Sequence, residues 1–381
     1  MNERERCPVF IHGGFRTSST WLWSRFRRNS RFWCYYEIFN SAIKFINSSN
    51  FESFSTKAWN SHHPKSEPYY IEYLPLLHDK SCLTFFPIEK QRGEYFTPVG
   101  GISAELDHNS QDYVAHLIDA AQTIYEKQPV LSCTGMLAKV AGLKNGFGGV
   151  HILLVRNLFS QWNSYSGQQR GGTSFFVDYL FGALRFARDD RFLMYLKEFA
   201  KVDEFGSADE WASRDRYDDV FCVFVAFHVY LLVNASRYCD VVIDSDSLVG
   251  EHGGYRENME SILAGLIGHR VDLSGARESI DCPQYPIARP AAAKFMIERL
   301  AQRACSELTA SPGEHQMVSS LLEALWDKHD QFALFGGAAF AQFDKARMAL
   351  ENSRAETEQL KQDLAQMRSE RDAIRCSGKS I

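Results

Sequence analysis

The sequence lacks the features that mark disulfide-stabilised, zinc-binding and membrane-spanning proteins. Its nine cysteines are odd in number, irregularly spaced and contain no Cys-x-x-Cys pair, which argues against a disulfide framework and a structural zinc site. The most apolar stretch, Val220–Val233, contains His228 and falls short of the roughly 20 residues that cross a bilayer. It predicts a buried helix. Because the apolar segment Pro8–Ile11 follows the first residues closely, we expect no signal peptide and a soluble, cytoplasmic protein.

A strong excess of either charge is also missing. The sequence has 42 Lys and Arg against 47 Asp and Glu, a formal net charge of −5. This balance gives no overall positive field for nucleic acid or an anionic membrane, so any anion site must be built locally. We expect no nucleic-acid partner, no membrane span and no metal ion. The length of 381 residues, 45% of them hydrophobic, suffices for one large α/β domain.

Short apolar runs alternate with helical periodicity along the chain, which predicts a parallel sheet covered on both faces. The predicted strands are Pro8–Ile11, Arg31–Glu37, Pro129–Cys133, His151–Val155 and Asp240–Asp244. Helical patterns lie at 18–29, 110–127, 157–165, 214–239 and 255–268. Residues 47–109 are predicted to be irregular insertions over the sheet, where acceptor specificity is commonly set. We expect a three-layer α/β/α domain over residues 1–335.

The end of the sequence changes in composition. From about Phe340 it is rich in Ala, Glu, Gln, Lys and Arg, with neither Pro nor Gly until Gly378. Two series of residues spaced seven apart interleave as the a and d sites of a heptad: Leu350, Thr357, Leu364 and Arg371, and Ser353, Leu360, Met367 and Ile374. The pattern predicts an amphipathic helix over 340–375 that forms a short coiled coil and a homo-oligomer. A solvated helix that packs on its own domain is the alternative.

The first predicted strand runs into a glycine turn, followed by one cation and four hydroxyl-bearing residues at a helix start. The segment reads Phe10-Ile11-His12-Gly13-Gly14-Phe15-Arg16-Thr17-Ser18-Ser19-Thr20-Trp21. Such a turn directs backbone N–H groups to one point near the positive end of the helix dipole, which predicts an anion site. Arg16 adds a delocalised charge that bridges phosphate oxygens. The structural alternative is an N-capped helix with a surface arginine.

A second group of polar residues follows the predicted strand His151–Val155. Arg156 and Asn157 come directly after it, and Ser164 lies eight residues beyond Arg156. Ligands of open α/β sheets bind where the strands end. Two anion sites on one sheet edge indicate a ligand with two separated phosphates.

Together these segments resemble the sulfotransferase superfamily that uses 3′-phosphoadenosine-5′-phosphosulfate, which implies a P-loop-like sulfotransferase fold. The run from Arg16 to Trp21 is similar to the family's 5′-phosphosulfate loop, [KR]-[ST]-G-[ST]-[ST], often followed by Trp. Arg156-Asn157 with Ser164 resembles the 3′-phosphate motif R-[DN]-P-x(5)-S, and Asp240–Leu248 resembles a late strand typified by V-I-x-Y-E-D-L. Ser18 stands where the family usually has Gly, and Leu158 where it usually has Pro.

The resemblance implies a role for each matching residue. Arg16 holds the 5′-phosphosulfate and stabilises the leaving phosphate, and Arg156 and Ser164 bind the 3′-phosphate. Trp21 stacks on adenine, for which an indole ring is suited; a core position is the alternative for it. The same phosphosulfate is cradled by the hydroxyl and backbone groups of Thr17, Ser18, Ser19 and Thr20. No metal is implied.

Transfer to a hydroxyl also needs a base. Glu37 ends the aromatic strand Arg31–Glu37, where the resemblance to tyrosyl-protein and carbohydrate sulfotransferases implies a catalytic glutamate, and aromatic neighbours raise a carboxyl pKa. A structural hydrogen-bonded Glu is the alternative reading. His62 and His63 are the second choice, because the small-molecule branch of the family resembles a histidine-base mechanism.

The sequence therefore predicts a sulfotransferase that acts on an acceptor hydroxyl, which we expect on a carbohydrate or glycan precursor. Two alternatives remain at this stage. One is a catalytically degenerate sulfotransferase fold that serves as a binding or scaffold protein through its C-terminal helix. The other is a P-loop-like nucleotide kinase, whose Gly-x-x-x-x-Gly-Lys-[Ser/Thr] pattern is missing from the glycine turn.

Overall fold

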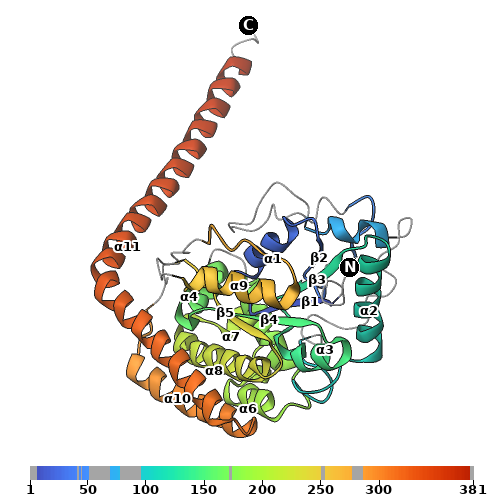
Figure 1. Cartoon of the computed structure of the whole chain (residues 1–381). Coiled ribbons are helices and arrows are strands. Elements are labelled where there is room, and N and C mark those ends of the chain that lie inside the picture. Colours follow the sequence, from blue (N-terminus) through green and yellow to red (C-terminus); the bar gives the residue numbers. More distant parts are fainter. Residues whose placement is uncertain are drawn as a thin grey trace. The chain divides into compact units, whose positions relative to one another are not determined.

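A five-stranded parallel sheet lies at the centre of the fold (Figure 1). The computed structural model describes residues 7–40, 43, 45–50, 69–77, 96–170, 174–249, 254–276 and 286–377. The strands are β1 Val9–Gly13, β2 Phe32–Tyr36, β3 Gln128–Cys133, β4 Val150–Val155 and β5 Val241–Asp244, in the order β2-β3-β1-β4-β5. All four neighbouring pairs are parallel. The α/β class with a parallel sheet is therefore confirmed.

Both faces of the sheet are covered. Every residue of β1 and of β3 is buried, and successive side chains of a strand point to opposite faces. Helices α1 Ser19–Arg27, α2 His108–Thr123, α8 Tyr217–Ser236 and α9 Tyr255–Ile267 pack against its strands. The other helices of this part of the chain are α3 Val140–Phe147, α4 Leu158–Arg170, α5 Phe175–Arg185, α6 Arg191–Phe199, α7 Ala208–Trp211 and α10 Pro290–Glu307. This burial explains why the strands read as continuous apolar runs.

Local signals in the sequence account for several helix ends. Asp107 caps α2 by accepting a hydrogen bond from the Ser110 N–H at 3.0 Å, and Asp190 caps α6 in the same way through Leu193. Gly268 ends α9 in a left-handed conformation, with φ at 79°, which glycine adopts without a Cβ penalty. The predicted helix at 255–268 therefore stops where its glycine is.

Helix α8 is the one helix among the described residues that is long and apolar enough to span a membrane. Nearly all of its residues are buried inside the protein, from Tyr217 to Ala235 with few exceptions. A helix that is apolar all round suits the core of a large protein as well as a bilayer. The prediction of a buried core helix is thus confirmed, and the helix is consistent with a soluble protein.

Two boundaries differ from the sequence-based expectation. The strand β1 extends through His12 and Gly13, which we expected in the turn; the His12 ring is fully buried, with Nε2 2.8 Å from Nδ1 of His151 on β4. Of the expected irregular region 47–109, the described part contains a 3-10 helix at Ile71–Leu76 and the start of α2.

The last helix, α11, spans Pro312–Ser377 and begins well before the expected start near Phe340. The helix continues through Gly336 and Gly337, because each glycine costs a helix only about 1 kcal/mol and long flanking segments tolerate that. By internal contacts the chain divides into the units Met1–Leu325 and Trp326–Ile381, so the division falls inside α11 and ahead of the expected boundary at 335. The following sections treat the first unit until α11 is taken up by itself.

Candidate functional site

The order of the strands places the topological switch point of the sheet between β1 and β4. After β1 the chain crosses to β2 on one side of the sheet, and after β4 it continues to β5 on the other side. Loops that leave neighbouring strands in opposite directions open a space at the carboxyl ends of those strands, where open α/β sheets bind ligands. The segment Gly14–Ser18 follows β1, and Arg156 and Asn157 follow β4. Both predicted anion-binding segments therefore follow the two strands at the switch point.

The loop between β1 and α1 has a strained backbone. Arg16 and Ser18 both have φ at 67°, in the left-handed region that L-residues rarely adopt. Ser18 is the N-cap residue of α1, but its side chain makes no capping hydrogen bond, so the first amides of α1 are left to a ligand or to water. The family's usual Gly at this position is explained by that φ angle. Such strain persists where the surrounding structure over-determines it, commonly at functional sites.

Other atoms hold the loop in place. The Thr17 hydroxyl donates to the Gly14 carbonyl oxygen at 2.7 Å, and the Gln161 amide donates to the Phe15 carbonyl oxygen at 2.7 Å. A Cβ on Gly14 would lie 2.7 Å from the Gln161 amide nitrogen, so this glycine permits the close packing of loop and α4. The four hydroxyl residues differ in placement: Thr17 and Ser19 are buried, Ser18 is exposed, and the Thr20 hydroxyl is 2.8 Å from that of Tyr36.

The two predicted cations meet in one cluster. Arg16 Nε donates to the Ser164 hydroxyl at 2.6 Å, and Arg156 Nη1 donates to the Arg16 carbonyl oxygen at 2.9 Å. Arg156 is 7% exposed and lies 3.5 Å from the carboxylate of Asp246. The described contacts thus gather two guanidinium groups around one carboxylate, a concentration of cations that suits an anion. The arrangement is tighter than the two separate phosphate sites expected from the sequence, because the Arg16 side chain reaches Ser164.

Asn157 has a structural role in this cluster. Its side-chain oxygen accepts hydrogen bonds from the amides of Phe159 and Ser160 at 3.0 and 3.2 Å, which caps α4. The backbone N–H of Asn157 donates to the Asp246 carboxylate at 2.8 Å. Asp246 lies in the turn after β5, within the segment that resembles the family's late strand, so this weak motif connects to the cation cluster. Leu158, where the family usually has Pro, is the first residue of α4 and is fully buried.

Trp21 lies on α1 at the border of the core. Its ring is partly buried against core residues, and the guanidinium of Arg25 lies 5.4 Å from the ring centroid. Its indole N–H is buried and has no hydrogen-bond partner. One face of the ring is therefore taken by Arg25. Both the stacking role and the core role predicted for Trp21 have support in this environment.

Glu37 follows β2 directly, at the same edge of the sheet as the loop after β1. It is 6% exposed and has φ at 49°, a third non-glycine residue of this edge in the left-handed region. Its carboxylate accepts hydrogen bonds from the Thr134 hydroxyl at 3.0 Å, the Thr134 amide at 3.3 Å and the Cys133 thiol at 3.4 Å. Thr134 and Cys133 lie at the end of β3, so two neighbouring strand ends hold the carboxylate.

Burial raises the pKa of Glu37 to about 7, although the hydrogen bonds from Thr134 and Cys133 act in the opposite direction. The aromatic surroundings anticipated from the sequence include Tyr36 and Tyr70, whose own pKa values are raised by burial and by the nearby Glu37 charge. A carboxyl with a pKa near 7 is matched to proton transfer at physiological pH. Perturbed carboxyls of this kind are concentrated at functional sites.

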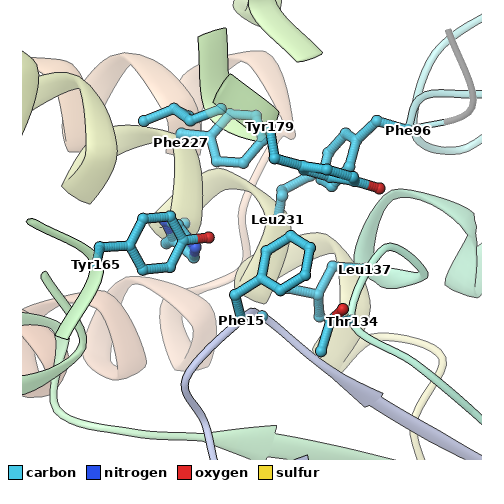
Figure 2. A pocket seen from close by; sticks show the side chains of 11 residues that line it. Phe15, Phe96, Thr134, Leu137, Tyr165, Tyr179, Phe227 and Leu231 are labelled. Carbon is cyan, nitrogen blue, oxygen red and sulfur yellow. The ribbon is translucent and has the colours of Figure 1, made fainter. Parts of the chain in front are cut away.

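A small apolar cavity lies beside the loop (Figure 2). Its walls include Phe15, Phe96, Tyr165, Tyr179 and Phe227, and Thr134 lines the same cavity. About 10 Å³ is open to the centre of a water molecule, which is room for about one water. An acceptor that enters here has to displace aromatic side chains. Through Thr134 the cavity adjoins the Glu37 carboxylate.

His228 on α8 also lines this cavity. Its Nδ1–H donates to the Phe224 carbonyl oxygen at 2.8 Å, so Nε2 is the nitrogen with the lone pair. This Nε2 lies near Gly14, 3.3 Å from the place where a Cβ on that glycine would stand. Burial lowers the pKa of His228 to about 4, so the ring is neutral. His228 is absent from the predicted site residues because it lies within an apolar helix. Its imidazole in an otherwise apolar run was the one feature of the sequence that could have indicated a site.

Thr134 is the other residue that sequence reasoning missed. Nothing in the sequence near Thr134 indicates that its hydroxyl meets Glu37, which is 97 positions away. The histidine alternatives, His62 and His63, lie outside the described residues. Among the described residues, no group of three or more His, Cys, Asp or Glu side chains is placed to hold a metal ion. The described cysteines Cys7, Cys34, Cys133, Cys222, Cys239 and Cys305 are free thiols.

Comparison of the chain with protein-family models, with curated proteins and with solved structures found no match. The geometry of the site is therefore the basis for the function proposed below.

Replacing Ser18 by Gly tests the strain in the loop. At a φ of 67° the serine Cβ is unfavourable by about 1–2 kcal/mol, and glycine removes that strain at the cost of about 0.5–1 kcal/mol of unfolded-state entropy. We expect Ser18→Gly to unfold at the same or a higher temperature and Ser18→Val to unfold at a lower one, measured by calorimetry. Ser18→Ala, which keeps the Cβ, should match the wild type. A loss of stability in the glycine variant would contradict the loop conformation.

Proposed function

We propose that this protein is a sulfotransferase with a P-loop-like sulfotransferase fold, which transfers the sulfuryl group of 3′-phosphoadenosine-5′-phosphosulfate to an acceptor hydroxyl. The observation that carries the proposal is the convergence of Arg16, Ser164 and Arg156 at the carboxyl ends of two adjacent strands. A carboxyl with a raised pKa lies at the next strand ends along the same edge. Anion-binding groups and a base on one edge are what transfer from an anionic donor requires.

In this proposal Arg16 and the first amides of α1 bind the 5′-phosphosulfate. Arg16 exchanges its bond to Ser164 for the donor, a rotation of one long side chain, and the Ser164 hydroxyl then binds the 3′-phosphate together with the neighbouring Arg156. Positive charge at the bridging oxygen stabilises the leaving phosphate as charge develops on it. Positioning and electrostatics therefore supply most of the catalysis, as in phosphoryl transfer.

Thr134 connects the base to the cavity. Its hydroxyl donates to Glu37 and lines the cavity in which the acceptor would lie. The acceptor oxygen forms a bond to sulfur as the bond between sulfur and the bridging oxygen breaks. The acceptor proton passes to the Thr134 hydroxyl oxygen, and the Thr134 proton passes to the Glu37 carboxylate. The products are a sulfate ester and adenosine 3′,5′-bisphosphate.

Replacing Thr134 by Val or Ser tests this proton path. Valine keeps the shape but removes the hydroxyl, so we expect Thr134→Val to lose about 10²-fold or more in turnover, within the range of a lost acid–base group. Thr134→Ser keeps the hydroxyl and should retain most activity. Turnover is measured with saturating donor. If Thr134→Val remains active and only its pH profile moves to higher pH, the carboxylate of Glu37 meets the acceptor directly and the relay is wrong.

The acceptor class is proposed from the sequence as a carbohydrate or glycan precursor. The aromatic cavity walls, Phe15, Tyr165 and Phe227 among them, offer rings on which sugars and phenols both stack. Incubation of the chain with labelled donor and a panel of glycans, phenols and lipid alcohols tests the proposal. Label in a sulfate ester, together with release of adenosine 3′,5′-bisphosphate, is the expected result. Donor binding without transfer to any acceptor would favour the scaffold alternative, and phosphate transfer from ATP the kinase alternative.

A further inference from the structure

Part of helix α11 carries an unpartnered apolar row. Leu350, Leu360, Leu364 and Met367 lie on described helical backbone, and their exposed fractions are 54%, 68%, 48% and 58%. All four occupy a or d positions of the heptad, which places them along one side of the helix. Rows of exposed large apolar side chains mark interaction surfaces. The structure thus shows a surface suited to another helix.

The residues that flank this row are sorted by charge. The sequence places Glu356, Asp363 and Glu370 at successive g positions, and it places basic residues at every e position: Arg354, Lys361, Arg368 and Arg375. An amphipathic helix that only needs solubility has no reason to separate its charges in this way. In coiled coils the e and g residues determine the partner and its orientation. The separation therefore carries information about the partner.

We propose that residues 350–375 form a parallel, in-register, two-stranded coiled coil with a second copy of this chain. In a parallel pair each g residue faces the e residue of the following heptad on the other helix. Glu356 then faces the partner's Lys361, Asp363 the partner's Arg368, and Glu370 the partner's Arg375, and the twofold symmetry repeats all three pairs. Each pair joins opposite charges. The contact is about 38 Å long at 1.5 Å per residue.

The same charges disfavour the antiparallel arrangement. In an antiparallel pair g residues face g residues and e residues face e residues, so acidic side chains oppose acidic ones and basic oppose basic. Repulsion of this kind suppresses the competing orientation. Within one chain, Lys361 pairs with Glu358 at 2.6 Å, and Gln359 donates to Asp363 at 2.9 Å. Contacts between exposed side chains one turn apart are weak, so they do not prevent exchange for interhelical pairs.

This inference does not depend on the proposed chemistry, because it rests on the heptad positions and charges of α11 alone.

Sedimentation of the full-length chain tests the association. We expect a concentration-dependent dimer in the wild type and a monomer in Leu360→Asp/Leu364→Asp. A second variant, Glu356→Lys/Asp363→Lys/Glu370→Lys, keeps the apolar row and good helix formers but places like charges at every pair, so it should also be monomeric at low salt. Circular dichroism checks that both variants keep their helix. A monomeric wild type at about 100 µM, or a dimer that survives in both variants, overturns the proposal.

Disulfide trapping tests the orientation and register. In a chain with Cys376 replaced by Ser, Ser353→Cys at a d position brings two cysteines to a Cα separation of about 6 Å in a parallel in-register pair, within disulfide range. The matched control is Ala355→Cys at an f position, on the far side of the helix. We expect a 353–353 cross-link, identified by mass spectrometry, and none at 355. A dimer in which position 353 does not cross-link is antiparallel or shifted, and the proposal fails.

Discussion

We expect Glu37→Gln to lower the turnover of the proposed sulfuryl transfer by about 10²–10⁴-fold, the contribution of a positioned general base. Glutamine still accepts hydrogen bonds from the Thr134 amide and hydroxyl, which hold the carboxylate in the wild type, so the strand ends keep their geometry. The donor site after β1 and β4 is formed by other residues. Donor affinity should therefore change less than about threefold, a difference well below 1.4 kcal/mol. Turnover and donor binding are measured on the same preparation.

The pH dependence of turnover gives an independent readout. In the proposed mechanism the ionised carboxylate of Glu37 is the active form, and burial raises the pKa of Glu37 to about 7. Turnover of the wild type should rise with pH through about 7 and then level off. Matched variants are His228→Gln, His62→Gln and His63→Gln. The neutral His228, with a pKa lowered to about 4 by burial, is a weak base, so its replacement should leave the profile in place. Normal turnover in Glu37→Gln would move the histidines into the role of base.

The raised pKa also predicts how stability changes with pH. The folded pKa of Glu37, about 7, lies above the ordinary value of 4.5, so between these values the folded protein binds more protons than the unfolded chain. Stability therefore falls as pH rises from about 4.5 to 7. At 1.36 kcal/mol per unit, the upper limit is about 3 kcal/mol. Glu37→Gln removes this cost, so its melting temperature relative to the wild type should increase between pH 5 and pH 8.

Replacing Arg156 by Met lowers the affinity for adenosine 3′,5′-bisphosphate by about 10–100-fold, because a charge-assisted hydrogen bond contributes about 1.5–3 kcal/mol. The affinity for AMP, which lacks the 3′-phosphate, should fall far less in this variant. The wild type is thus expected to prefer the bisphosphate over AMP, and the variant to have little preference. Arg156→Lys keeps the charge without the planar fork and should be intermediate. Titration calorimetry with both nucleotides measures the preference.

Lys144→Met is the matched control for this charge change. Lys144 binds the Gly149 carbonyl and the Asp240 carboxylate at the amino end of β4, the opposite end of the same strand. The affinity of Lys144→Met for both nucleotides should therefore equal that of the wild type. Arg156 also contacts the Arg16 carbonyl oxygen, so a purely structural role would weaken both nucleotides equally. An equal loss for AMP and the bisphosphate in Arg156→Met would therefore reject the assignment of the 3′-phosphate to Arg156.

The strands and helices around the site could be predicted because their signals are local. The runs that became β1, β3, β4 and β5 are short, apolar and bounded by turn residues. The buried core helix could be predicted because its apolar run, Val220–Val233, is shorter than a membrane span and contains His228. The start of α11 could not be predicted, because the Gly336-Gly337 pair signals a break that a 66-residue helix overrides. The contact of the buried His12 ring with His151 could not be predicted either, because it depends on the pairing of β1 with β4.

The sequence pattern indicates which residues lie at the candidate site better than it indicates which of them touch one another. Arg16, Arg156 and Glu37 each follow an apolar run, and parallel strands bring such positions to one edge of a sheet. The contacts of Glu37 with Thr134 and of Arg16 with Ser164 join residues 97 and 148 positions apart. Side-chain meetings of this kind are set by tertiary packing, which leaves no local pattern. For the same reason no sequence pattern indicates that Arg16 and Arg156 share one cluster.

Titration of the wild-type chain with adenosine 3′,5′-bisphosphate is the most direct test of the central claim, that the strand ends of β1 and β4 form a site for a doubly phosphorylated adenosine. Saturable binding that stabilises the fold is predicted, by about 2.7 kcal/mol at a free nucleotide concentration 100 times the dissociation constant. AMP and magnesium ATP should bind more weakly. Absence of any binding at millimolar bisphosphate, or tighter binding of magnesium ATP, would contradict the account.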